Sequence, residues 1–308
     1  MKTNLIKLMA AGTVMALALT LAACGSAGET PEDALNKAQE AMNGVSSMHY
    51  TMDMDIGMSA DGESYDITTT AEADCIIDPM TLGMDMHMSM ASLLDLDMKM
   101  YMVQDGSSYT IYTGMDDGDG NITWTQETMD DLDALAQYNG QKSMEIYLEN
   151  GTNFTEAGSE EINGVNATRY DGVITGDSIQ AVMDASGVID QFASLGLEGL
   201  EELYQDLGDI PVSIWLDPDT SLPVKYEMDM TAMMQGMMDK LMASEDETAD
   251  LGLTIDKCAV VMVCSDYNGI DAIEIPQEAL DASSADDLGN LLVDQEEEAL
   301  EQAAEDAA

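Results

Sequence analysis

The first third of the chain alternates between apolar and polar residues. From Tyr50 to Met58, and again from Leu82 to Met90, every second residue is apolar and is separated from the next by Thr, Asp, Gly, His or Ser. Side chains of a β-strand point to opposite faces in turn, so this period of two predicts strands with one Met-rich face and one acidic, hydrated face. Twelve of the 28 Met residues lie between Met48 and Val103.

Turn signals divide this region into strands at about residues 47–59, 65–77, 80–90 and 93–103. The dipeptides Asp61-Gly62, Asp78-Pro79 and Ala91-Ser92 are the expected turns. Because the connections are short, we expect neighbouring strands to be antiparallel. By the same criteria, further strands are expected at about residues 108–113, 121–126, 153–161, 165–174, 210–217, 222–229, 251–263 and 270–275.

Helical patterns occur in four places. Thr30-Pro31-Glu32-Asp33 is a typical helix start with an N-cap and first-turn acids, and Asn43-Gly44 ends that helix. Met residues recur at intervals of three and four within 230–243, which predicts an amphipathic helix. Weaker helical patterns lie at about residues 129–150 and 176–206.

The N-terminus has the features of an export signal. Lys2 and Lys7 precede an apolar run, from Leu8 to Leu21, that is too short for a good membrane span. The following Leu21-Ala22-Ala23-Cys24 resembles the lipobox of bacterial lipoproteins, in which the Cys is diacylated on its sulfur and becomes the first residue after cleavage. We therefore expect lipidation of Cys24 and anchoring on the extracytoplasmic face of the cell membrane.

Composition limits the possible partners and the domain count. The chain has 9 Lys and Arg against 61 Asp and Glu, a formal net charge of −52 that repels nucleic acid and anionic lipid headgroups. Its 308 residues, 45% of them hydrophobic, are compatible with one main domain. We expect a signal peptide (1–23), a lipidated Cys and tether (24–30), the folded domain (31–280) and an acidic tail (281–308).

Three segments and the order of the elements resemble a known superfamily. The strand start at Val45-Ser46-Ser47-Met48-His49-Tyr50-Thr51-Met52 and the later run from Trp215 to Lys225 are similar to the LolA/LppX/LprG-like lipoprotein carriers, as is the closing Ile273-Glu274-Ile275-Pro276. The resemblance implies an α+β fold with a large curved antiparallel sheet, a half-barrel. Helices would cover its concave apolar face, which receives acyl chains.

Three interpretations of the Met-rich face remain open. The face binds a lipid, an acyl chain or another apolar ligand, because the flexible thioethers of Met adapt to a mobile guest. Alternatively, the same residues fill a closed core in a structural or interaction lipoprotein. The third interpretation is a copper(I) site around Met84-Asp85-Met86-His87-Met88, which strand geometry disfavours because His87 points away from the Met side chains. The candidate ligand-binding residues are Met52, Met54, Met58, Met84, Met86, Met88, Met98, Met100, Met234 and Met238.

The sequence gives little support for catalysis. Its two His, His49 and His87, are both expected on the hydrated face of strands. We find no nucleophile elbow, phosphate-binding loop or zinc-ligand spacing of Cys and His. We therefore expect a non-enzymatic protein without a cofactor or a metal site. Besides Cys24 the chain has Cys75, Cys258 and Cys264, which we interpret as small buried hydrophobic residues.

Overall fold

The structure is a computed structural model that describes residues 30–60, 63–90, 94–116, 120–129, 151–176, 178, 208–244 and 254–284. Its core is one sheet of twelve strands. They are β1 (Ser47–Ala60), β2 (Glu63–Ile76), β3 (Thr81–Met90), β4 (Leu94–Asp105), β5 (Ser108–Asp116), β6 (Ile122–Met129), β7 (Gly151–Ile162), β8 (Val165–Ile174), β9 (Ile210–Leu216), β10 (Pro223–Asp229), β11 (Thr254–Ser265) and β12 (Ser283–Ser284).

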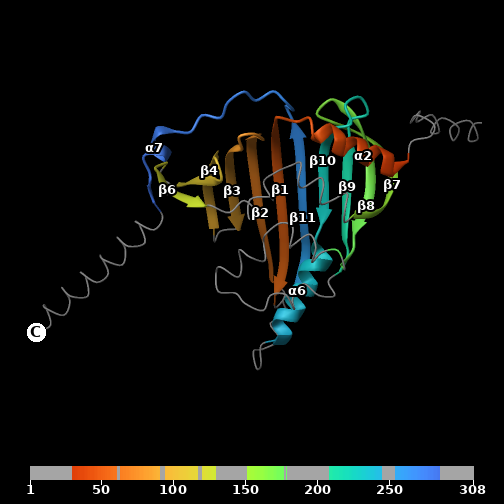
Figure 1. The fold of residues 1–308 in the computed structure, drawn as a ribbon. Coiled ribbons are helices and arrows are strands. Elements are labelled where there is room, and N and C mark those ends of the chain that lie inside the picture. Colours follow the sequence, from red (N-terminus) through yellow and green to blue (C-terminus); the bar gives the residue numbers. More distant parts are fainter. Residues whose placement is uncertain are drawn as a thin grey trace, which may run out of the picture.

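The sheet is open, with β12 and β7 at its two edges. The spatial order is β12-β6-β5-β4-β3-β2-β1-β11-β10-β9-β8-β7, and Figure 1 shows the strands side by side in this order. Neighbouring strands are antiparallel, except that β12 pairs with β6 in parallel. The large curved antiparallel sheet expected from the sequence is therefore confirmed.

Alternation of apolar and polar residues fixes the register of the long strands. In the β1–β2 hairpin Met52 lies opposite Ala71 and Asp53 lies opposite Thr70, so apolar residues share one face and polar residues the other. The turn between β7 and β8 uses Asn163 and Gly164, both with positive φ (50° and 84°), as the Asn-Gly sequence predicts. We call the two sides of the sheet the apolar face and the polar face.

Helix α2 (Pro31–Met42) begins as its sequence predicts. The Thr30 side chain accepts a hydrogen bond from the Asp33 backbone N–H (3.1 Å), and Asp33 accepts one from the Thr30 backbone N–H (3.1 Å), which forms a capping box. Its apolar residues pack on the apolar face near one end of the strands, in a cluster that includes Met48 and Leu82. The buried residues of α2 are Ala34, Leu35, Ala38 and Met42.

The predicted Met-rich helix is α6 (Thr231–Ser244), which crosses from β10 to β11. Thr231 Oγ1 accepts a hydrogen bond from the Cys258 backbone N–H (2.9 Å), and Gln235 Oε1 accepts one from the Ile255 backbone N–H (2.6 Å). These bonds fix α6 to the first residues of β11, at the end of the strands opposite α2 (Figure 1).

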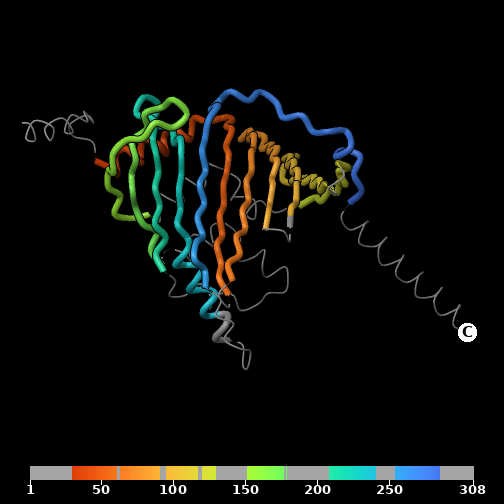
Figure 2. Tube along the Cα trace, turned by 180° about the vertical axis from the view of Figure 1, so that it is seen from behind, coloured from red at the N-terminus to blue at the C-terminus, as the bar shows by residue number. Residues whose placement is uncertain are grey.

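The segment after β11 crosses the sheet instead of forming the predicted strand at 270–275. Figures 1 and 2 show it running over the ends of the strands toward β6. Asn268 holds its start, because its side-chain oxygen accepts a hydrogen bond from the Ser46 backbone N–H (2.7 Å). Ile273 packs over Gly83 on the polar face. The segment continues through the short helix α7 (Gln277–Leu280) to β12.

Several predictions fall outside the described residues. They concern the signal peptide, Cys24, the helices at about 129–150 and 176–206, and most of the acidic tail. Among the helices that the structure describes, none combines the length and the apolar character needed to cross a membrane.

Candidate functional site

Met side chains form a row across the apolar face. The strand registers place Met262 of β11 opposite Met52 of β1, and Met86 of β3 opposite Met98 of β4. Between these pairs lies Ala71 of β2, and the row ends at Met115 of β5. Cross-strand neighbours on one face lie about 4.5–5.5 Å apart at Cβ, so the paired thioethers form an apolar surface that Ala71 divides.

Strand β2 interrupts this surface with small side chains. On the apolar face it carries Thr69, Ala71, Ala73 and Cys75, all of them buried. Their neighbours are larger: Met52 and Met54 on β1, and Met86 and Met88 on β3. The small residues therefore form a stripe, about 20 Å long at 3.3 Å per residue, between two rows of Met side chains. We call Thr69, Ala71, Ala73 and Cys75 the β2 stripe.

Burial of the apolar face decreases with distance from α2. Met48, Cys75, Leu82 and Met102, in the row nearest to α2, are at most 3% exposed. The row centred on Ala71 lies farther from α2 and is more accessible. Its residues Met52, Met86 and Met98 are half-buried, and Met115 is 48% exposed. The apolar face is thus a closed core at one end and partly accessible farther along the strands.

The structure brings together eight of the ten candidate Met residues. These eight lie on the apolar face of three strands: Met52, Met54 and Met58 on β1, Met84, Met86 and Met88 on β3, and Met98 and Met100 on β4. Helix α6 carries the other two. Met234 packs in a separate cluster with Ile174, Ile210 and Val212, and Met238 is half-buried.

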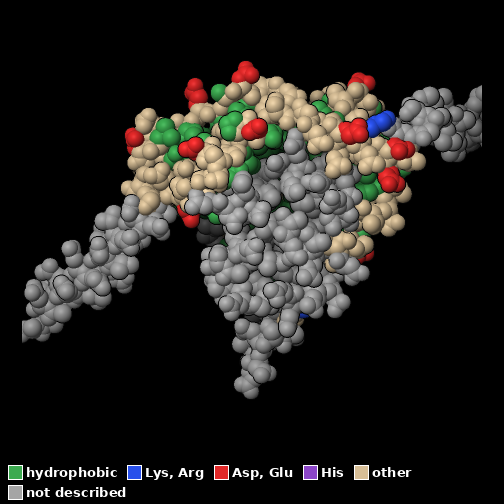
Figure 3. Space-filling view, viewed as in Figure 1, with side chains coloured by type: hydrophobic (Ala, Val, Ile, Leu, Met, Phe, Trp, Pro, Cys, Tyr) green, Lys and Arg blue, Asp and Glu red, His purple; other side chains and the backbone are tan. Residues whose placement is uncertain are grey.

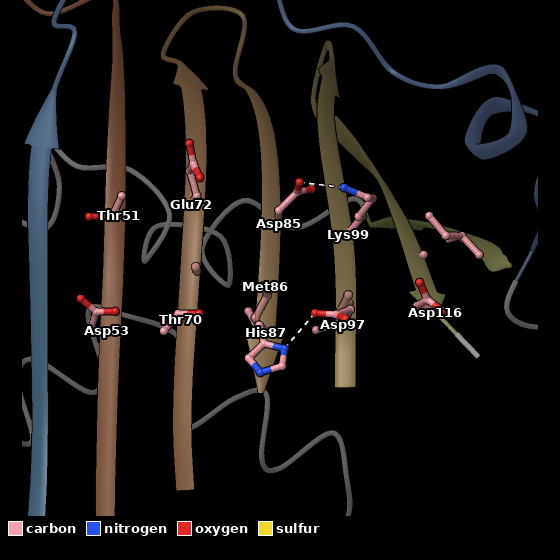
Figure 4. Close-up of a pocket in the computed structure, with 14 residues that line it drawn as sticks. Thr51, Asp53, Thr70, Glu72, Asp85, Met86, His87, Asp97, Lys99 and Asp116 are labelled. Atoms are coloured by element: carbon pink, nitrogen blue, oxygen red, sulfur yellow. Dashed lines mark hydrogen bonds and ion pairs between the residues drawn. The ribbon is translucent and has the colours of Figure 1, made fainter. Parts of the chain in front are cut away.

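The polar face carries a groove of about 650 Å³ over β1 to β6. Its lining includes Asp53, Asp85, His87, Asp97 and Asp116, and Figure 4 shows these side chains on β1, β3, β4 and β5. Lys99 Nζ lies 2.7 Å from Asp85 Oδ2, and His87 Nδ1 lies 2.8 Å from Asp97 Oδ1. Acidic side chains are also scattered over the opposite side of the molecule, where basic ones are few (Figure 3).

Both His side chains lie on the polar face, as the alternation predicts. His87 therefore points away from Met86 and Met88, which removes the geometry that a copper(I) site of His and Met side chains needs. His87, Asp95 and Asp97 form a group whose candidate ligand atoms all lie within 4.8 Å of one another, and this group was not predicted from the sequence. The signal was present, because the expected hairpin of strands 80–90 and 93–103 brings these residues to one face.

The cysteines of the described chain are buried and unpaired. Cys75, Cys258 and Cys264 are free thiols, each at most 3% exposed. Burial raises the pKa of Cys75 to about 11 and that of Cys264 to about 12. They are therefore small core residues, as expected, and their thiols are poor nucleophiles.

Comparisons with solved structures find weak overall similarity. Lipoprotein LppX of Mycobacterium tuberculosis is 14% identical with a TM-score of 0.39, over 80% of this chain and 97% of that one. LprF of Mycobacterium bovis is 13% identical with a TM-score of 0.43, over 80% of this chain and 96% of that one. No curated protein matches the chain.

A family model matches most of the chain. It is described as a family of unknown function, DUF6612, and it aligns with residues 30–284. This range begins at the N-cap of α2 and ends at the last residue of β12, so it contains every described element. The chain therefore belongs to the DUF6612 family.

Proposed function

We propose that this protein is a non-enzymatic lipoprotein, anchored through Cys24 on the extracytoplasmic face of the cell membrane, that binds an apolar ligand on its Met-rich face. The ligand class is a lipid or an acyl chain. The observation that carries the proposal is the β2 stripe, where small buried residues lie between two rows of half-buried Met side chains.

The size pattern of this face suits a long, narrow apolar guest. Small residues in the middle of a face leave room above the backbone, while Met on both sides supplies flexible and polarizable walls. The proposed binding residues are Met52, Met54, Met58, Met84, Met86, Met88, Met98 and Met100, with Met234 and Met238 of α6 at the far end of the strands.

The anchor and the charge support the same proposal. Lipidation of Cys24 would keep the domain close to the membrane, because only five residues separate Cys24 from the N-cap Thr30. The net charge of −52 opposes contact between the domain and a surface of anionic headgroups. The apolar face would therefore bind individual lipid molecules. The buried thiols and the carboxylate-paired His residues of the described chain give no support for catalysis.

The alternative is a structural or interaction lipoprotein whose apolar face is a closed core. The nearly complete burial of Met48, Cys75, Leu82 and Met102 near α2 favours this alternative at that end of the sheet. The two functions differ in what occupies the space above the β2 stripe.

Substitution of Ala71 by Leu separates them. We would purify the mature chain with Cys24→Ser, measure co-purified lipid by native mass spectrometry, and measure uptake of a fluorescent fatty acid. In a ligand-binding protein, Ala71→Leu fills ligand space, so uptake falls at least tenfold while the stability of the ligand-free protein is kept. In a closed core, no ligand is bound and overpacking lowers the free energy of unfolding by about 1–3 kcal/mol.

Thr70→Leu is the matched control, because Thr70 directly precedes Ala71 in β2 and lies exposed on the polar face. It should leave uptake unchanged. Met86→Asp with Met88→Asp is a second variant, which places charges beside the stripe and should abolish uptake. A clean ligand-free mass together with no uptake by the parent protein would refute the proposed function.

A further inference from the structure

Two carboxylates converge on one nitrogen of His87. Its Nδ1 lies 2.8 Å from Asp97 Oδ1 and 3.9 Å from Asp95 Oδ1. The register explains this arrangement, because Asp97 is directly opposite His87 across β3 and β4, and Asp95 lies two residues before Asp97 on the same face of β4. One imidazole nitrogen and two carboxylate oxygens therefore point toward one small volume.

The other His of the chain shows that this convergence is not a general result of high acidity. His49 also has two carboxylates nearby, but Asp74 lies 2.8 Å from its Nδ1 and Glu72 lies 3.8 Å from its Nε2. The two ring nitrogens point in different directions, so these carboxylates cannot share one ion with the imidazole. Among the described residues, only the His87 group brings three candidate ligand atoms within 4.8 Å of one another.

The surroundings of His87 leave room for an ion and its water. His87 and Asp97 line the groove of about 650 Å³ on the polar face (Figure 4). The side chains of His87, Asp95 and Asp97 are all partly or fully accessible. The nearest cation of β4, Lys99, is held by Asp85 at 2.7 Å, two residues from His87 along β3. The excess of carboxylates over cations also raises the local concentration of divalent cations.

We propose that His87, Asp95 and Asp97 form a binding site for a divalent transition-metal ion of the zinc class. One imidazole and two carboxylates are a donor set that Zn²⁺ accepts, whereas Ca²⁺ and Mg²⁺ prefer oxygen ligands alone. The ion replaces the proton that His87 and Asp97 share, and water completes its coordination. It links β3 to β4 on the face opposite the Met-rich surface, so the site is independent of the proposed lipid binding.

The test measures Zn²⁺ binding to the lipidated protein in detergent, after treatment with a chelator, by isothermal titration in the presence of excess Mg²⁺. We expect one tight equivalent in the parent protein. His87→Gln should weaken it at least about tenfold, by analogy with the loss of ligand-orienting groups, and Asp97→Asn should act in the same direction. His49→Gln is the matched control and should retain the tight equivalent.

Thermal unfolding provides a second measurement on the same proteins. Saturating Zn²⁺ should raise the unfolding temperature of the parent and of His49→Gln but not of His87→Gln, since a ligand that binds only the folded state stabilises it. Equal loss of binding in the two His variants, or binding that Mg²⁺ removes, would show only diffuse attraction to acidic residues and would overturn the proposal. A His87→Gln protein that keeps its parent circular dichroism spectrum excludes misfolding as the cause.

Discussion

The ring of Phe154 lies against the backbone of Gly172, where a Cβ atom on residue 172 would overlap Cδ1 and Cε1 of the ring. Phe154 is on the edge strand β7, Gly172 is on β8, and the pairing of these strands is irregular between Thr152 and Thr155. Phe154 packs against two clusters: the one that contains Met48, Leu82 and the buried residues of α2, and the one that contains Ile174 together with Met233 of α6. Gly172 thus allows one aromatic ring to join the two parts of the apolar face.

We predict that Gly172→Ala destabilises the protein by about 1–3 kcal/mol, because the new methyl group displaces the Phe154 ring. Urea unfolding followed by circular dichroism measures this change. Gly57→Ala is the control, since the nearest side-chain or backbone atom to its added Cβ would lie at 3.4 Å, an ordinary contact. Equal stability of the Gly172→Ala protein and the parent would contradict the assigned position of Phe154.

A second prediction concerns Trp215, which is fully buried on the polar face of β9. Arg169 and Lys225 lie over its ring, with Cζ and Nζ at 4.9 and 4.3 Å from the centroid, and its Nε1–H donates a hydrogen bond to Glu160 (3.0 Å). Lys225→Gln should cost about 0.5–2 kcal/mol through loss of the cation–π contact.

Arg169→Gln should cost more than Lys225→Gln, because Arg169 also holds Asp171 (2.6 Å) and Ser213 (3.2 Å). Chemical unfolding of the two variants under identical conditions gives the comparison. Equal costs would mean that the Asp171 and Ser213 contacts contribute nothing measurable.

A third prediction concerns the reactivity and the number of free thiols. Burial raises the pKa of Cys75 to about 11, so about one Cys75 thiol in a thousand is ionised at pH 8. The ionised fraction of Cys264 is smaller still, because burial raises its pKa to about 12. A chromogenic thiol reagent should therefore react slowly with the folded protein. After unfolding, three thiols should react in a protein that is lipidated on Cys24, and four should react in a chain that is not. Four reactive thiols in the membrane-extracted protein would therefore contradict lipidation.

A fourth prediction concerns acid unfolding. Burial tends to raise the pKa of Asp171, but hydrogen bonds from Arg169 and Ser213 and the charge of Arg169 lower it overall. Hydrogen bonds from Thr231 lower the pKa of Asp229, which precedes α6. A carboxyl with a lowered pKa in the folded state stabilises the fold above its unfolded value, near pH 3.9, and this stabilisation is lost as the pH falls through the folded pKa.

Thermal unfolding temperature should therefore rise from pH 8 toward about pH 5, as protonation reduces repulsion within a chain of net charge −52, and fall below about pH 4. Asp171→Asn with Asp229→Asn should flatten the fall below pH 4, while the exposed control Asp271→Asn should leave it unchanged. An unfolding temperature that keeps rising down to pH 3 would contradict this assignment.

Local patterns in the sequence were sufficient for most of the strands and for two helices. Strict alternation places Met52 and Asp53 on opposite faces wherever the strand pairs, and the capping residues around Thr30 act within one turn of α2. The segment 270–275 was predicted wrongly, because apolar alternation there serves packing of Ile273 over Gly83 and not strand pairing. Such a segment has the composition of a strand, but it crosses the ends of strands that are already paired on both sides.

The sequence by itself determined which residues share a face, because the two-residue period of a strand is a local property of the backbone. Only the tertiary structure decided which strands are neighbours, and so which residues meet across them. Ala71 became the centre of a row of Met residues because β1 and β3 both pair with β2. Asp95 and Asp97 converged on His87 because cross-strand register, which depends on the whole sheet, sets those distances.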